Sequence, residues 1–180
     1  MTDIIFESGF LKITPRNAAE PGPIHSHTSR SYAGNWRASA AHPTCPIGVD
    51  IALSPPPRDY ASVVKEFYHA QEQRAFLHHF PEQQRMVFLA SWTMKEAWCK
   101  AMKLGITHGL PGPDLSSWMQ DGCPSRQWNH MGNRPYSAQY LVLPCDDQML
   151  FVSVMILLQA EGGHKIAKTI TGNFYFRTGG

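Results

Sequence analysis

The stretch from Arg85 to Leu104 can form one long helix, because it contains no glycine or proline and repeats apolar residues three or four positions apart. That spacing places the apolar side chains along a single stripe of an α-helix. The stripe consists of Val87, Ala90, Met94, Ala97, Ala101 and Leu104. Gly105 stands where a left-handed C-terminal cap is expected. The sequence therefore predicts a long amphipathic helix that packs its stripe on another layer of structure.

Several shorter segments have the apolar pattern of β-strands and are bounded by turn residues. They are 4–14, as a hairpin around Ser8-Gly9, then Trp36–Ala41, Ile47–Leu53, Ser137–Leu143 and Met149–Leu158, with 166–176 as a further candidate. Residues 15–28, rich in proline and small polar residues, predict an irregular loop. The prolines at 55–57 end the strand before them, since proline supplies no amide donor to a sheet. Asp50 therefore lies inside a strand.

The remaining segments predict helices and one long loop. Residues 60–80 have mainly helical spacing and end near Pro81, so the long helix begins after Glu82. Residues 111–135 predict a long loop with a short helix near Trp118. Together these elements indicate an α+β fold with helices packed on a largely antiparallel sheet. A chain of 180 residues is expected to form one domain over 1–180.

Charge and composition argue against several functions. The formal net charge is +2 and no run of Lys and Arg stands out, so we expect no nucleic-acid partner. The N-terminus is acidic and has no long apolar segment, and no apolar run approaches the roughly 20 residues of a membrane span. We therefore expect a cytoplasmic protein without a membrane partner. The four cysteines form no C-x-x-C pair and predict reduced thiols, and the histidines show no ligand spacing for a metal.

Asp50, Glu96 and Lys100 form the combination of residues most suggestive of chemistry. Magnesium prefers oxygen ligands and usually takes one or two carboxylates together with substrate phosphates and water. Glu96 and Lys100 lie one helical turn apart, so one can bind a metal while the other reaches a phosphate oxygen. The spacing alone also fits an ordinary ion pair on a helix surface.

The residues around this combination resemble the 4′-phosphopantetheinyl transferase superfamily. Its signatures, G-[IV]-D and [FW]-x-x-K-E-[AS]-x-x-K, are matched in order by 48–50 and by 92–100. Between them, 67–72 is similar to the family's F-[FY]-x-x-x-E segment, and 31–36 is similar to the S-H-S-G-x-W segment of surfactin-type members. The resemblance covers about residues 29–110. It implies the family's α+β fold.

Carried over by position, the resemblance makes Asp50 and Glu96 magnesium ligands and Glu72 a further acidic group, either metal ligand or base. Lys100 would bind the phosphate attached to pantetheine. In the implied reaction, Glu96 or a water that it orients deprotonates a serine hydroxyl of an acyl, peptidyl or polyketide carrier protein. The serine then attacks the β-phosphate of coenzyme A, and 3′,5′-ADP leaves. The implied cofactors are Mg²⁺ and coenzyme A as co-substrate.

The resemblance also implies contacts to coenzyme A. Lys95 would neutralise or orient the acidic cluster, and Ser31 and Tyr32 match positions that contact the nucleotide end. Arg16 and Arg30, together with Lys12, are the only Lys and Arg residues that precede Ser31 in the given sequence, and we expect Arg16 and Arg30 to contact coenzyme A.

Three departures from the family pattern affect this prediction. Tyr32 stands where surfactin-type members commonly have His, and Ala52 stands where many members have a metal-binding Glu, so water is expected there. About thirty residues precede Ser31, whereas a surfactin-type enzyme has a whole first half that supplies basic residues to the 3′-phosphate. The coenzyme pocket is then either reduced or completed by another subunit. The chain is accordingly expected to be a monomer or a homo-oligomer. The alternatives to a transferase are a non-catalytic protein that binds coenzyme A or a carrier protein, and an unrelated α+β domain.

Overall fold

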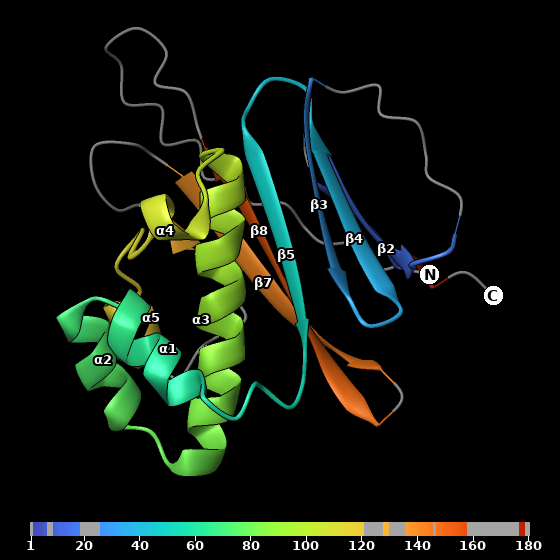
Figure 1. Ribbon diagram of the computed structural model, residues 1–180. Helices are drawn as coiled ribbons and strands as arrows, with labels where there is room; N and C mark the ends of the chain where they lie inside the picture. Colours follow the sequence, from blue (N-terminus) through green and yellow to red (C-terminus); the bar gives the residue numbers. More distant parts are fainter. Residues whose placement is uncertain are drawn as a thin grey trace, which may run out of the picture.

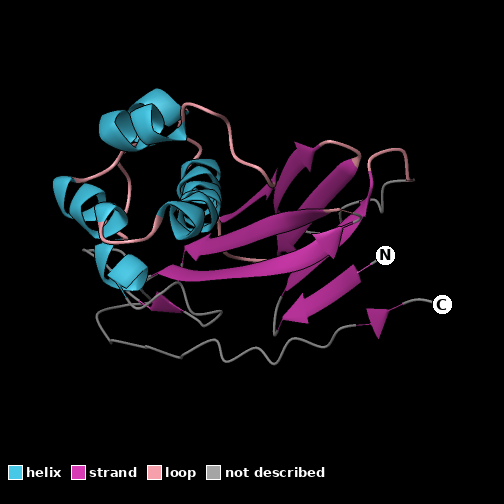
Figure 2. Cartoon of the chain, turned by 90° about the horizontal axis from the view of Figure 1, so that it is seen from below, coloured by secondary structure: helices cyan, strands magenta, loops and turns pink. Residues whose placement is uncertain are grey.

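The computed structural model describes residues 2–6, 9–18, 26–120, 128–129, 136–145, 147–157 and 177–178. They form two antiparallel sheets and a set of helices (Figures 1 and 2). The helices lie on one side of the sheets in both views, and strand β5 lies between the long helix and the N-terminal sheet (Figure 1). This arrangement confirms the predicted α+β fold with helices on antiparallel sheets.

The N-terminal sheet has the strand order β3-β4-β2-β1-β9. Its strands are β1 (Thr2–Phe6), β2 (Gly9–Pro15), β3 (His27–Ala33), β4 (Trp36–His42) and β9 (Arg177–Thr178). The predicted hairpin at 4–14 is confirmed by the pairing of β1 with β2. Strand β3 was not predicted, because only Ser31 along it is buried and its sequence lacks an apolar alternation.

The second sheet has the order β5-β8-β7-β6. Its strands are β5 (Ile47–Leu53), β6 (Trp128–Asn129), β7 (Tyr136–Cys145) and β8 (Gln148–Leu157). The predicted strand pair at 137–143 and 149–158 is confirmed and is longer than expected, since β7 pairs with β8 from Tyr136 to Cys145. The candidate strand at 166–176 lies outside the described residues.

This second sheet is the middle layer of the fold. Val152, Val154 and Ile156 of β8 face a core shared with the N-terminal sheet. Phe151 and Met155 face the helices on the opposite side. A strand covered on both faces favours apolar residues on both faces rather than an alternation, which explains why β8 is apolar from Met149 to Leu157 except at Ser153. The buried Ser153 hydroxyl pairs with the Thr93 hydroxyl at 2.7 Å.

The predicted helix over 60–80 is in fact two helices, α1 (Tyr60–Phe67) and α2 (Ala70–Leu77). The helical conformation is interrupted at Tyr68, whose backbone is extended with φ −108° and ψ 149°. His69 caps α2, and the Glu72 carboxylate accepts a hydrogen bond from the His69 amide at 2.7 Å. A cap with its reciprocal glutamate satisfies amide groups that an uninterrupted helix would otherwise bond internally. The prediction of one helix was therefore wrong.

The long helix is α3 (Pro81–Ala101), which begins with proline at its first turn. The prediction that Gly105 forms the left-handed cap was wrong, because Lys103 takes that conformation with φ 56°. The Leu104 amide donates to the Cys99 carbonyl at 2.8 Å and the Lys103 amide to the Lys100 carbonyl at 3.1 Å. These two bonds form a Schellman motif with lysine in the position that glycine usually occupies.

The predicted apolar stripe on α3 is buried at every position except Leu104, which lies beyond the end of the helix and is 40% exposed. The stripe is not single, however, because the helix is covered on two sides. Met94 packs against the other helices, while Ala97 and Ala101 pack against β7 and β8. Two short helices, α4 (Ile106–Gly109) and α5 (Ser116–Gln120), follow α3, and α5 confirms the helix predicted near Trp118. Within the described parts of the chain, no helix is long and apolar enough to cross a membrane.

Candidate active site

The contact between β5 and α3 places the predicted acidic residues together. Gly48 lies so close to the α3 backbone at Ala97 and Ala101 that a side chain has no room there. Residues two apart on a strand share a face, so Asp50 also projects toward the helix, whereas Val49 faces the core between the sheets. The glycine of the G-[IV]-D motif therefore lets the strand approach the helix closely enough for the aspartate to reach it.

Asp50 is bound by groups from two other elements. Its side chain is buried, and Oδ1 accepts hydrogen bonds from Lys100 Nζ at 2.7 Å and from Ser31 Oγ at 2.6 Å. The Lys100 side chain remains 33% exposed, so its charged end can still meet a ligand arriving from solvent. The structure thus brings together one residue each from β3, β5 and α3 at a single carboxylate oxygen.

Glu96 completes this cluster through its carboxyl group. Burial, and then the negative charge of Asp50, raise the pKa of Glu96 to about 7, while Lys100 lowers it. Burial likewise raises the pKa of Asp50, and Lys100 and Ser31 oppose that rise. The hydrogen bond between the two carboxyl groups raises the pKa of Glu96 and lowers that of Asp50. The two carboxyl groups therefore titrate as a pair, and both hold a proton more tightly than free carboxyl groups do.

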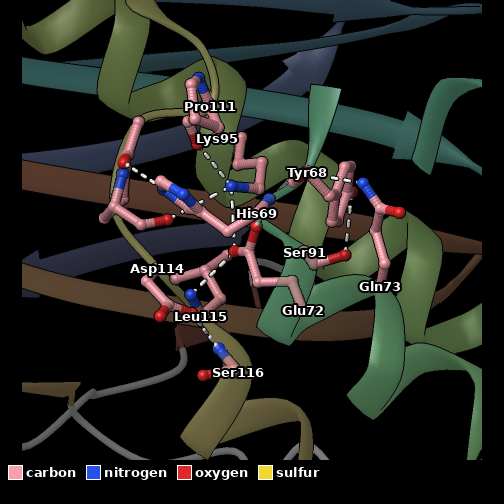
Figure 3. Close-up of polar contacts among 12 residues, drawn as sticks. Tyr68, His69, Glu72, Gln73, Ser91, Lys95, Pro111, Asp114, Leu115 and Ser116 are labelled. Carbon is pink, nitrogen blue, oxygen red and sulfur yellow. Dashed lines mark hydrogen bonds and ion pairs between the residues drawn. The ribbon is translucent and has the colours of Figure 1, made fainter. Parts of the chain in front are cut away.

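Glu72 and Lys95 form a separate cluster (Figure 3). Both side chains are fully buried, and Lys95 Nζ lies 2.9 Å from Glu72 Oε1. Lys95 also donates to the carbonyl oxygens of Pro111 and Pro113, and its Nζ lies 4.8 Å from the centre of the Tyr68 ring. Burial lowers the pKa of Lys95, and the charge of Glu72 opposes that effect.

The Glu72 carboxylate also accepts hydrogen bonds from backbone amide groups. It accepts the Leu115 amide at 2.7 Å on Oε1 and the His69 amide at 2.7 Å on Oε2, and His69 Nε2 contacts the Gly112 carbonyl at 3.0 Å (Figure 3). Buried charges that are paired and fully hydrogen-bonded hold neighbouring segments in place. This pair ties the loop at 111–115 to α2 and α3.

The three remaining predicted residues lie on the outer face of the N-terminal sheet. Along β3, Ser31 points inward to Asp50, whereas Arg30 and Tyr32 are exposed on the other face. The Arg16 guanidinium lies 5.3 Å from the centre of the Tyr32 ring, which is a cation–π distance. The predicted set is thus divided among three places: Ser31, Asp50, Glu96 and Lys100 together, Glu72 with Lys95, and Arg16, Arg30 and Tyr32 outside.

The sequence did not indicate one residue that touches the site and one that lies beside it. Trp92 hydrogen-bonds to the Glu96 side chain and lowers its pKa. Ser29, two positions before Ser31 on β3, accepts the Val49 amide at 3.0 Å. The second motif begins with an aromatic position one helical turn before Glu96, and that position could have indicated Trp92. A polar strand offers no comparable signal for Ser29.

The donor set at Asp50 and Glu96 fits a hard divalent cation. Two carboxyl groups that compete for one proton supply oxygen ligands of the type that Mg²⁺ takes, with phosphate oxygens and water completing its shell. Within the described residues no group of three or more His, Cys, Asp or Glu side chains could hold a metal. Ala52, which packs toward the helices, provides no carboxylate.

The fold and the site together define an α+β protein with a two-carboxylate, one-lysine site suited to a divalent cation and phosphate oxygens. The family model of the 4′-phosphopantetheinyl transferase superfamily matches residues 46–145, which is more than half of the chain and includes Asp50, Glu96 and Lys100. The chain belongs to this superfamily.

Two curated relatives each match about half of the chain. The 4′-phosphopantetheinyl transferase psf-1 of Bacillus pumilus is 34% identical over 84 residues, which is 47% of this chain and 35% of that protein. A Synechocystis sp. protein described by name as a candidate 4′-phosphopantetheinyl transferase is 31% identical over 104 residues, covering 54% of this chain and 42% of that protein. The matched part spans less than half the length of either relative.

Proposed function

We propose that this chain transfers the 4′-phosphopantetheine group from coenzyme A to a serine of an acyl, peptidyl or polyketide carrier protein, releasing 3′,5′-ADP. The observation that carries the proposal is the meeting of Asp50, Glu96 and Lys100 within the segment that the family model matches. Both acidic residues come from the two family signatures, which lie on different elements and converge at one point.

Glu96 is the proposed proton acceptor for the serine hydroxyl. A general base works best when its pKa is close to the operating pH, and the pKa of Glu96 is raised to about 7. Its partial burial and its neighbour Asp50 produce this value, so the site prepares the base through its own geometry.

Lys100 is the proposed contact to the phosphate being attacked. Its side chain is partly exposed, and its hydrogen bond to Asp50 holds the ammonium group beside the two carboxyl groups. Phosphoryl transfer depends mainly on positioning and on stabilising charge on the phosphate oxygens. When bound at Asp50 and Glu96, Mg²⁺ would supply further stabilisation of that charge.

The other predicted residues receive different roles in this proposal. Glu72 and Lys95 take no part in proton or phosphate transfer, because each already bonds to the other and to backbone groups. Arg16, Arg30 and Tyr32 remain proposed contacts to the nucleotide end of coenzyme A, since exposed guanidinium groups bind phosphate well.

The rival function is a non-catalytic protein that binds coenzyme A or a carrier protein with the same fold. Incubation with coenzyme A, Mg²⁺ and an apo carrier protein, followed by intact-mass measurement of the carrier, separates the two. The transferase proposal predicts that the carrier gains the mass of one phosphopantetheine. Calorimetric binding of coenzyme A or of the carrier without any mass gain would favour the rival.

A further inference from the structure

We propose that Ser31 is a positioning residue whose hydroxyl group orients the Asp50 carboxylate for the metal. This inference rests on the proposed function, because it concerns how the metal ligand is held. It differs from the contact to the nucleotide end of coenzyme A that the family resemblance implies for this position.

The geometry of the Ser31 side chain supports this role. Ser31 Oγ donates to Asp50 Oδ1 at 2.6 Å, and the two residues are 6% and 3% exposed. Ser31 is the buried residue of β3, while its neighbours on the strand are exposed or half-buried. Hydrogen bonds from a hydroxyl to a carboxylate are short and strong, and a buried one has no water to compete with it. The hydroxyl therefore restricts how the carboxylate can turn.

Both donors meet on the same oxygen of Asp50. Lys100 Nζ donates to Oδ1 at 2.7 Å, from α3, while Ser31 approaches from β3. Two donors from opposite elements determine the orientation of a carboxylate more tightly than one does. When Lys100 turns toward a phosphate, Ser31 remains as the donor that keeps Asp50 in place. Partners behind a metal ligand commonly change metal affinity by about 10- to 100-fold.

Ser31 also links two sheets that share no backbone ladder among the described residues. Strand β3 belongs to the N-terminal sheet and β5 to the second sheet. Two serines on one face of β3 make the connection, since Ser29 Oγ accepts the Val49 amide at 3.0 Å and Ser31 Oγ donates to Asp50. Ser29 therefore provides a matched control, because it bridges the same two strands without touching a carboxylate.

The test is a titration of Mn²⁺, as a paramagnetic substitute for Mg²⁺, into wild type, Ser31→Ala, Ser31→Thr and Ser29→Ala in the presence of coenzyme A. We expect Ser31→Ala to weaken Mn²⁺ binding about tenfold. Ser29→Ala should stay within about twofold of wild type, because it loses a bond between strands and not a bond to Asp50. Ser31→Thr retains the hydroxyl and should recover most of the affinity. Thermal melting of each variant without metal confirms that all are folded.

A second titration, of coenzyme A in the presence of EDTA, separates this role from direct contact to the coenzyme. We expect wild type and Ser31→Ala to bind coenzyme A equally well without metal. Weaker coenzyme binding with unchanged Mn²⁺ affinity would overturn the inference and assign Ser31 to the coenzyme. An equal loss of Mn²⁺ affinity in Ser29→Ala would overturn it in favour of a general loosening of β3. Failure of wild type to bind Mn²⁺ would overturn the proposed function itself.

Discussion

Gly48 and Ala97 are in direct backbone contact: a Cβ atom at residue 48 would lie 1.9 Å from the Ala97 carbonyl oxygen and 2.6 Å from the Ala101 amide nitrogen. Backbone atoms of a helix cannot move aside as the end of a flexible side chain can. The closeness of β5 and α3 therefore depends on the missing side chain, and the distance from Asp50 to Lys100 depends on that closeness.

Gly48→Ala should accordingly destabilise the fold and separate Asp50 from α3. Overpacking of a filled core typically costs about 1–3 kcal/mol, and a contact to helix backbone places this substitution at or above the upper end. Urea unfolding followed by circular dichroism measures the loss. The control is Gly105→Ala, where no atom lies within 4 Å of the added Cβ, so the change should stay within about 1 kcal/mol. Similar stability of both variants would contradict the close contact.

Lys100→Ala should lower kcat at least about 100-fold, because the lysine acts on charge that develops during transfer. It should also cost about 1–3 kcal/mol of stability, since a buried Asp50 loses a charged donor. Steady-state kinetics and urea unfolding on the same preparation separate the two effects. An unchanged kcat would remove Lys100 from the mechanism.

The pH dependence of stability should follow from the raised pKa of Glu96, about 7 against its usual 4.5. The folded chain holds this proton more tightly than the unfolded chain does, so the contribution is fully present below about 4.5 and is lost as the pH rises through 7. The free energy of unfolding, measured in EDTA, should therefore decrease from about pH 5 to about pH 8.

Glu96→Gln should flatten much of that fall, because the amide does not titrate. The pKa of Asp50 is raised as well, so Asp50 contributes a fall in the same direction that Glu96→Gln does not remove. Identical pH profiles for wild type and Glu96→Gln would show that Glu96 titrates normally.

Binding of Mg²⁺ with coenzyme A should weaken as pH falls through 7, since the metal competes with the Glu96 proton.

Removing one member of the Glu72–Lys95 pair should destabilise the chain far more than removing both. Each single variant, Glu72→Gln or Lys95→Met, leaves a buried charge without its partner, which typically costs about 3–5 kcal/mol. The double variant should cost clearly less than the sum of the two, as measured by urea unfolding in a double-mutant cycle. The control is Glu82→Gln, because Glu82 is exposed and lies on α3, the helix that carries Lys95. This substitution should change the free energy of unfolding by less than about 0.5 kcal/mol. Additive effects would contradict the structural pairing.

The meeting of Asp50 with Lys100 was predicted from the ordered pair of family motifs, because local patterns place one residue in a strand and the other on a helix without bringing them together. The apolar spacing identified α3, and the prolines after β5 placed Asp50 inside a strand. Neither signal depends on distant parts of the chain.

Other features depend on contacts that no local pattern reveals. Periodicity could not show that α1, α2 and α5 cover the second side of α3. It therefore could not show that Lys95 pairs with Glu72 and not with the residues around Asp50. Lys103 adopts the left-handed cap although glycine lies two positions further on. The role of Ser31 arises from the packing of one sheet on another, which is a tertiary property of a polar strand.

The central claim, that the cluster of Asp50, Glu96 and Lys100 performs the transfer, is tested most directly by intact-mass spectrometry of an apo carrier protein. The carrier is incubated with coenzyme A, Mg²⁺ and one of three proteins: wild type, Glu96→Gln or Glu82→Gln. Both substitutions turn a glutamate of α3 into its amide, but Glu82 is exposed in the first turn and far from Asp50 along the helix. We expect complete conversion of the carrier by wild type and Glu82→Gln and almost none by Glu96→Gln. Equal conversion by all three, or no conversion by wild type, would contradict it.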